Sequence, residues 1–136
     1  MNPSPHKNQI DKAHTVDRRW IINDRGYANI IPSPGDIVYG LVFELTASDK
    51  RSLDTYEGLA YERLYLPVDV VAKDDVANTR SVNSLIYIDV ERKTESEPVN
   101  EYIRRMNMAI IDGLKEGIPG DYIEKYLRPF IPETNN

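Results

Sequence analysis

The sequence predicts an α+β fold with a curved antiparallel or mixed sheet followed by helices. Segments in which apolar residues alternate fill the first two thirds of the 136-residue chain, and apolar residues spaced three or four apart dominate its end. Strands first and helices later are typical of α+β proteins and not of doubly wound sheets. The length fits one domain, which we expect at 13–132, between a polar tail at 1–12 and a short tail at 133–136.

Five extended segments bounded by turn signals are expected, at 18–23, 27–32, 36–45, 64–71 and 81–90. The segment 36–45 is apolar on both faces, so we expect it to be a central strand. Gly40 within it indicates close approach of another backbone or of a ligand. Pro67 cannot donate a hydrogen bond to a neighbouring strand, which favours an edge or bulged position for its segment.

Three helices are expected. A short helix follows the segment 36–45, with Ser48 as N-cap and Gly58 just beyond its end. The longest helix lies within 98–117 and stops at Gly117. Apolar residues at helical spacing mark its inner face: Val99, Tyr102, Ile103, Met106, Ala109, Ile110 and Leu114. A final helix begins near Pro119 and ends before Pro129.

Composition excludes several classes of function. The net charge of −5, without a basic stripe, argues against a nucleic-acid partner. The absence of cysteine excludes disulfides and thiolate chemistry, and two histidines, His6 and His14, are poor material for a zinc site or a serine triad. We therefore expect no metal and no cofactor. No apolar run is long enough for a signal peptide or a membrane span, so we expect a cytoplasmic protein without a membrane partner.

Glu57 is an unusual carboxylate because it lies in the last turn of the short predicted helix, directly before Gly58 and next to Tyr56 and Tyr61. Unpaired carbonyl groups give a helix C-terminus partial negative charge, which disfavours a carboxylate there. If aromatic rings also remove water from it, both effects raise its pKa toward neutrality, as a general acid/base requires. The alternative is an ordinary solvated glutamate in a capped turn.

Tyrosine is the preferred aromatic residue, with nine tyrosines against two phenylalanines. Four of them lie on different predicted elements and could converge on a polar pocket: Tyr27, Tyr61, Tyr87 and Tyr102. Tyrosine hydroxyls donate hydrogen bonds without adding charge, which suits a small zwitterionic ligand. The alternative is that these rings fill the core with their hydroxyls at its margin.

Taken together, several stretches resemble the γ-glutamylcyclotransferase family and its AIG2-like relatives. They are GYANIIPSPGDIVYGLVFEL (26–45), LDTYEG (53–58) followed by a tyrosine and a strand, and SLIYID (84–89). The ending EYIRRMNMAIIDGLKEGIPGDYIEKYL (101–127) is similar to the closing helix of the family. The likeness covers 13–132, and WIINDRGYANI makes the chain most similar to the fungal branch.

The resemblance implies a small β-barrel-like mixed sheet flanked by helices, and an enzyme without metal or cofactor. In this family, a γ-glutamyl amino acid cyclises to 5-oxoproline and a free amino acid, a reaction of glutathione turnover. Glu57 falls on the family's catalytic acid/base, and Tyr61, Tyr87 and Tyr102 match tyrosines that line the substrate pocket. The resemblance also suggests a homodimer.

The chain departs from the family pattern at its N-terminus. Relatives open with a strand that ends in a tyrosine-glycine-serine-asparagine loop, which binds the glutamyl group, and nothing in MNPSPHKNQIDKAHTV (1–16) matches it. We therefore expect the first strand and loop of the family to be missing. This leaves two alternatives open: a catalytically inactive binding or structural homologue, and a sibling cyclotransferase for γ-glutamylamines or secondary-metabolite conjugates.

Overall fold

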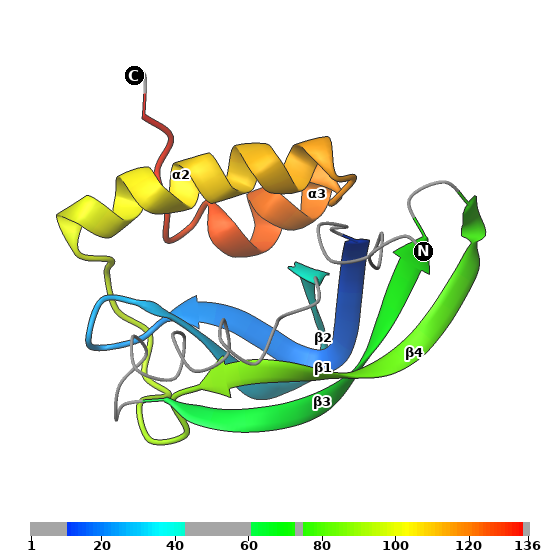
Figure 1. Ribbon diagram of the computed structural model, residues 1–136. Helices are drawn as coiled ribbons and strands as arrows, with labels where there is room; N and C mark the ends of the chain where they lie inside the picture. The colour runs from blue at the N-terminus through cyan, green and yellow to red at the C-terminus, as the bar shows by residue number, and fades with distance from the viewer. Residues whose placement is uncertain (1–10, 43–60, 73–74, 135–136) are drawn as a thin grey trace, which may run out of the picture.

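A four-stranded sheet and a layer of helices make up the computed structural model, which describes residues 11–42, 61–72 and 75–134. The strands are β1 (Asp11–Ile22), β2 (Ala28–Val42), β3 (Glu62–Ala72) and β4 (Asp75–Ile88). The helices are α2 (Asn100–Lys115), α3 (Gly120–Tyr122) and the π-helical turn η2 (Ile123–Leu127). Figure 1 shows the helices lying together on one side of the curved sheet. The predicted short helix after 36–45, with Glu57 in its last turn, lies outside the described residues.

The strand order is β2-β1-β3-β4, and every pairing is antiparallel. The α+β class is therefore confirmed. Among the described strands the sheet is antiparallel and does not close, in contrast to the mixed, barrel-like sheet that the resemblance implied. β2 lies at one edge among the described strands, so the expectation of a central strand at 36–45 is wrong. Helices, and not a further strand, cover one of its two apolar faces. On that face, Ile37, Tyr39 and Leu41 pack against the core that the helices complete.

β1 and β2 bend together halfway along their length. Their register shifts between Val16 and Arg18, where Asp17 has a φ of 61°. The turn predicted at 33–36 does not end a strand: β2 continues through these residues, which bulge opposite Asp17, and Gly35 has a φ of 87°. The Gly35 N–H donates to Asp17 Oδ1 at 3.0 Å, so each bulge helps to hold the other.

β3 lies between β1 and β4, so of the edge or bulged position expected from Pro67 the edge position is wrong, whereas the register of β3 with β4 does shift, between Val71 and Ala72. The contact between β1 and β3 is short and pairs residues 12–14 with residues 69–71. Pro67 lies beyond the last of these pairs, so its missing N–H removes no hydrogen bond from that contact. An interior strand can therefore contain this proline.

α2 begins and ends close to where the sequence predicts. Gly117 adopts a φ of 98°, and the Ile118 N–H donates to the Gly113 carbonyl at 3.0 Å, which is the hydrogen bond of a Schellman C-cap. On the inner face Ile110 is buried, but Ala109 and Leu114 are exposed, contrary to expectation.

A buried asparagine takes part of the inner face of α2. Asn107 donates to the carbonyls of Ile103 and Pro132, at 3.1 and 2.9 Å, and accepts from the Arg128 guanidinium at 2.6 Å. These bonds tie the C-terminal segment to the helix, and a polar side chain buried this way needs such partners.

The main core lies between the sheet and the helices. Its buried members are Trp20, Ile22, Val38, Ile110, Ile118, Tyr122, Ile123, Leu127 and Ile131. α3 and η2 form one continuous helical segment that starts after Pro119 and ends before Pro129, as predicted. Within the described chain, no helix is both long and apolar enough to cross a membrane.

Candidate active site

The turn between β1 and β2 carries Tyr27, one of the candidate ligand-binding side chains. Asn23 is fully buried, and its Oδ1 accepts hydrogen bonds from the N–H groups of Arg25 and Tyr27 at 3.1 and 3.4 Å. Gly26 has a φ of 89°, and a Cβ on it would lie 2.6 Å from Val99 Cγ1. Glycine is therefore required there by both conformation and space. The turn holds Arg25 and Tyr27 in one backbone arrangement.

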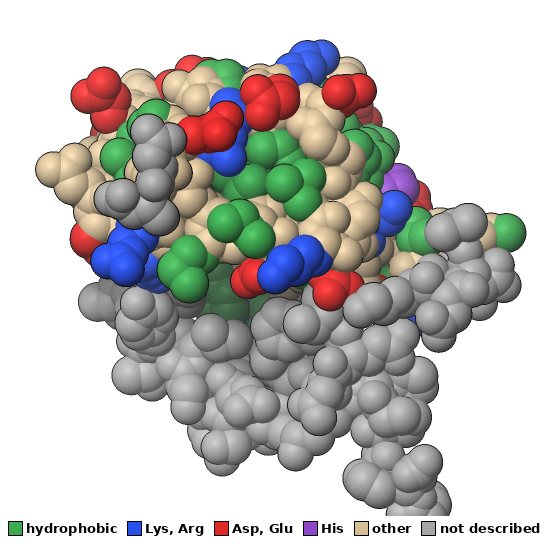
Figure 2. Space-filling model, turned by 90° about the horizontal axis from the view of Figure 1, so that it is seen from above, with side chains coloured by type: hydrophobic (Ala, Val, Ile, Leu, Met, Phe, Trp, Pro, Cys, Tyr) green, Lys and Arg blue, Asp and Glu red, His purple; other side chains and the backbone are tan. Residues whose placement is uncertain are grey.

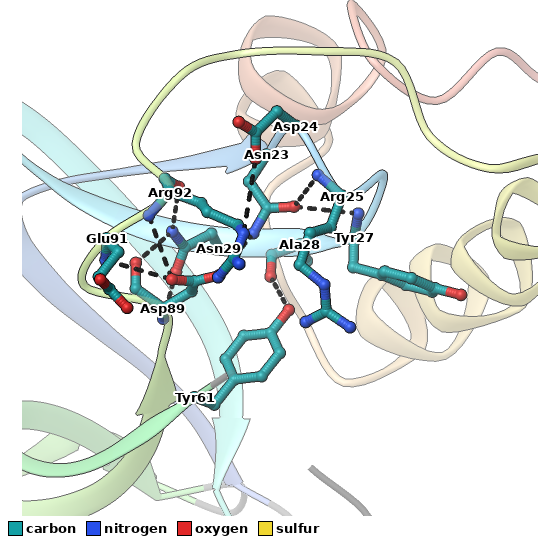
Figure 3. A network of polar contacts seen from close by, with 10 residues as sticks. All are labelled: Asn23, Asp24, Arg25, Tyr27, Ala28, Asn29, Tyr61, Asp89, Glu91 and Arg92. Atoms are coloured by element: carbon teal, nitrogen blue, oxygen red, sulfur yellow. Dashed lines mark hydrogen bonds and ion pairs between the residues drawn. The ribbon is translucent and has the colours of Figure 1, made fainter. Parts of the chain in front are cut away.

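A buried hydrogen-bond network around Asp89 holds this turn against the end of β4 (Figure 3). Asp89 is only 1% exposed, and one carboxylate oxygen accepts from the backbone N–H groups of Glu91 and Arg92 at 3.2 and 3.1 Å. The other oxygen lies 3.4 Å from Asn23 Nδ2 and 3.2 Å from Arg92 Nη1. Asn29 adds a reciprocal pair with the Asp89 backbone, both bonds at 2.9 Å. Each of these hydrogen bonds pairs a polar group of the buried Asp89, so we expect the network to be rigid.

Tyr27 and Tyr102 form the centre of the candidate site. Their rings pack edge to face with centroids 5.1 Å apart, although one residue lies in the β1–β2 turn and the other on α2. The Tyr27 hydroxyl donates to Glu101 Oε1 at 3.5 Å. A guanidinium group lies over each ring: that of Arg25 5.8 Å from the Tyr27 centroid and that of Arg105 5.1 Å from the Tyr102 centroid.

Tyr61 reaches the same turn from the start of β3. Its hydroxyl donates to the Ala28 carbonyl at 3.0 Å, and Figure 3 shows the Arg25 side chain directed toward the space between Tyr61 and Tyr27. Tyr87 lies on β4 opposite Arg63 of β3. The structure thus brings Tyr27, Tyr61 and Tyr102 to one turn. Glu57, four residues before Tyr61 in the sequence, lies outside the described residues.

Sequence reasoning missed three residues that build this site: Asn23, Arg25 and Asp89. Asn23 could have been recognised from the sequence, because an asparagine side chain at the start of a turn commonly accepts a hydrogen bond from the N–H group two residues ahead. Asp89 stands after the apolar run of β4, where a carboxylate needs partners to be buried. Nothing in the local sequence distinguishes Arg25 from the other arginines.

Two hollows lie on either side of the site's supporting strands. The first, of about 230 Å³, is lined mainly by apolar residues of all four strands, with His14, Thr15 and Ser84 as its polar members. The second, of about 200 Å³, lies between β2 and the helices and is lined by residues such as Trp20 and Met106. Gly40 borders both, and among the described residues no atom lies within 4 Å of a Cβ built on it, so of the expected backbone or ligand contact, none with backbone is seen there.

His14 belongs to β1 and not to a polar tail. Its Nε2 lies 3.5 Å from Asp69 Oδ2, and its ring packs near Tyr39 with centroids 5.4 Å apart. Among the described residues, no group of three or more histidine, aspartate or glutamate side chains is arranged to hold a metal ion.

Comparison with known proteins identifies the family. The family model described as gamma-glutamyl cyclotransferase, AIG2-like matches residues 4–109. A solved gamma-glutamyl cyclotransferase is similar with 22% identity and a TM-score of 0.64, over 92% of this chain and 75% of that one. A crystal structure of the uncharacterized human protein loc79017 is similar with 21% identity and a TM-score of 0.65, over 96% of this chain and 80% of that one.

The two solved structures establish a shared fold, and the family model covers more than half of the chain. No curated protein matches the sequence. From the family match, the chain belongs to the AIG2-like gamma-glutamyl cyclotransferase family.

Proposed function

We propose that this protein is a γ-glutamylcyclotransferase that converts γ-glutamyl amino acids or dipeptides into 5-oxoproline and a free amino acid or peptide. The observation that carries the proposal is the family match over residues 4–109, which includes Glu57 in LDTYEG. The grouping of Tyr27, Tyr61 and Tyr102 at one turn, close in sequence to that glutamate, supports it.

The proposed reaction is an intramolecular displacement. The α-amino nitrogen attacks the γ-carbonyl carbon, so a new C–N bond closes the five-membered ring and the original amide C–N bond breaks. The α-amino group is an ammonium at neutral pH and must first lose a proton, whereas the departing amine must gain one. Glu57 would perform both transfers, a contribution of about 10²- to 10⁴-fold in rate. Holding the substrate in its curled form adds an orientational gain, and backbone N–H groups would stabilise the tetrahedral oxyanion.

The tyrosines would bind and orient the substrate. Their hydroxyls can donate to the polar atoms of the glutamyl group without introducing another charge. The turn that carries Tyr27 is fixed by the buried Asn23 and Gly26, so little conformational freedom remains to be lost when a ligand binds.

Replacing Glu57 tests the mechanism directly. In the Glu57→Gln variant the acid/base is absent but the side-chain volume is kept, and we expect 5-oxoproline formation from a γ-glutamyl dipeptide to fall at least about 100-fold. Glu62→Gln is the matched control, because Glu62 is a nearby, exposed glutamate on β3. Full activity in the Glu57 variant would remove this residue from the mechanism.

A catalytically inactive homologue is the second candidate. The observation that favours it is the sequence MNPSPHKNQIDKAHTV, which lacks the substrate loop of the family, and loss of a single oxyanion donor can cost about 10²- to 10³-fold in rate. This candidate predicts heat of binding for 5-oxoproline in a calorimetric titration but no product from any γ-glutamyl substrate. A panel that includes γ-glutamylamines and secondary-metabolite conjugates would separate it from a sibling cyclotransferase.

A further inference from the structure

A γ-glutamyl ligand needs a cationic partner as well as a base. Its α-ammonium must lose a proton before it can attack, but its α-carboxylate stays ionised throughout, and so does the carboxylate of 5-oxoproline. An ionised carboxylate binds best to an arginine fork, which can donate two parallel hydrogen bonds. Glu57 and the candidate tyrosines supply no positive charge, so the predicted site is incomplete.

One arginine lies in the turn that carries Tyr27. Arg25 lies between Asp24 and Gly26 in the β1–β2 turn, and its guanidinium carbon is 5.8 Å from the centre of the Tyr27 ring. Figure 3 shows the guanidinium on the same side of the turn as the Tyr61 ring. Tyr27 therefore lies beside this group, and Tyr61 reaches the same turn through its bond to the Ala28 carbonyl.

The neighbouring arginines already have carboxylate partners. Arg105, which lies over the Tyr102 ring, has its Nη1 3.7 Å from Glu101 Oε1. Arg92 is held by Asp89, with Nη1 3.2 Å from Oδ2. Within the described ranges, no carboxylate forms an ion pair with the Arg25 guanidinium.

We propose that Arg25 binds the α-carboxylate of the γ-glutamyl group, and so makes the site selective for ligands that keep this carboxylate. The proposal rests on the proposed function for the identity of the ligand. The backbone of Arg25 is fixed by Asn23 Oδ1, and stacking on Tyr27 restricts its side chain, so the guanidinium is already oriented when the ligand arrives.

Calorimetric titration of two small probes tests the proposal without turnover. 5-Oxoproline carries the carboxylate, and 5-oxoprolinamide has the same ring with an uncharged amide in its place. We expect the unmodified protein to bind the acid about tenfold or more tightly than the amide, because a hydrogen-bonded charge contributes that much. In Arg25→Gln this preference should vanish through weaker binding of the acid, with binding of the amide unchanged, and Arg25→Lys should lie between.

Arg104→Gln is the control for removing a positive charge, since Arg104 is an exposed arginine on α2 away from the turn. Arg25 is also exposed, so its replacement should leave the thermal unfolding midpoint unchanged. A preference for the acid that persists in Arg25→Gln, or no preference in the unmodified protein, would overturn the proposal. Binding that depends on Arg25 without any 5-oxoproline formation would support it while contradicting the proposed catalytic function.

Discussion

Two places where β1 and β2 change direction use the same local chemistry in different surroundings. In the β1–β2 turn, Asn23 Oδ1 accepts from backbone N–H groups and Gly26 has a positive φ. In the mid-strand bulge, Asp17 Oδ1 accepts from the Gly35 N–H, and Gly35 has nearly the same φ. Asn23 is fully buried, whereas Asp17 is exposed. The comparison indicates that burial, and not the turn motif itself, decides how much such a motif contributes to stability.

The largest loss of stability is expected from disrupting the buried hydrogen-bond network around Asp89. Asp89→Ala leaves the buried Asn23 amide, two backbone N–H groups and the partly exposed Arg92 guanidinium without their acceptor, and each buried donor left unsatisfied costs about 1–3 kcal/mol. Urea unfolding followed by circular dichroism measures the loss. Asp24→Ala is the control, because Asp24 is exposed and lies 3.9 Å from Arg92, so its removal should cost about 0–1 kcal/mol. Similar losses in both variants would contradict the importance of burial.

The two glycines give a matched pair for the next largest effect. Gly26→Ala combines a left-handed backbone with a clash against Val99, and we expect a loss of about 2–4 kcal/mol. Gly35→Ala has the same backbone cost, about 1–2 kcal/mol, but nothing lies within 4 Å of its added Cβ. Unfolding in urea should therefore separate the two variants clearly. Equal losses would mean that the backbone conformation alone sets the cost at both sites.

The smallest effect concerns pH at the bulge. Asp36 accepts hydrogen bonds from Ser33 Oγ at 2.5 Å and from the Tyr126 hydroxyl at 2.6 Å, and these bonds, Ser33 first, hold the pKa of Asp36 below its ordinary value of 3.8. The same bond to Asp36 is the main cause that raises the pKa of Tyr126. A lowered carboxyl pKa stabilises the fold above pH 3.8, and this contribution disappears as pH falls through the folded-state value.

Tyr126→Phe tests this contribution by removing one donor to Asp36. We expect the variant to lose less stability than the unmodified protein when the pH is lowered from 7 to below 3.8, since its Asp36 pKa lies closer to the unfolded value. Urea unfolding at both pH values provides the measurement. An identical pH dependence in the two proteins would show that the Tyr126 bond does not influence Asp36.

Local signals in the sequence predicted where helices begin and end better than how the strands and helices are arranged. Gly117 as a helix end and Pro119 as a helix start were correctly recognised because each depends on backbone rules that act within a few residues. The edge position of β2 was missed because an apolar face looks the same whether a strand or a helix covers it. Asn107 was missed because its partners at Arg128 and Pro132 are distant in sequence.

The candidate site also combines residues that the sequence indicated with residues that only the structure reveals. The residue types that a small polar ligand would need pointed to Tyr27, Tyr61, Tyr87 and Tyr102. The structure places Tyr27, Tyr61 and Tyr102 at one turn, and Tyr87 on β4 opposite Arg63. Arg25 could not be selected, because its distinction is the absence of an ion pair within the described ranges, which depends on where the other charges fold. The role of Glu57 and the missing N-terminal loop remain predictions from the sequence.

The hydrogen bonds that lock the β1–β2 turn have a consequence for protein synthesis. Asn23 is 66 residues from Asp89, and Tyr27 is 75 residues from Tyr102. A growing chain therefore exposes the turn long before its anchoring partners exist, and contacts this far apart form late. The proposed ligand binding would therefore require that α2 has left the ribosome, and we expect fragments that end before α2 to lack it even when their strands have paired.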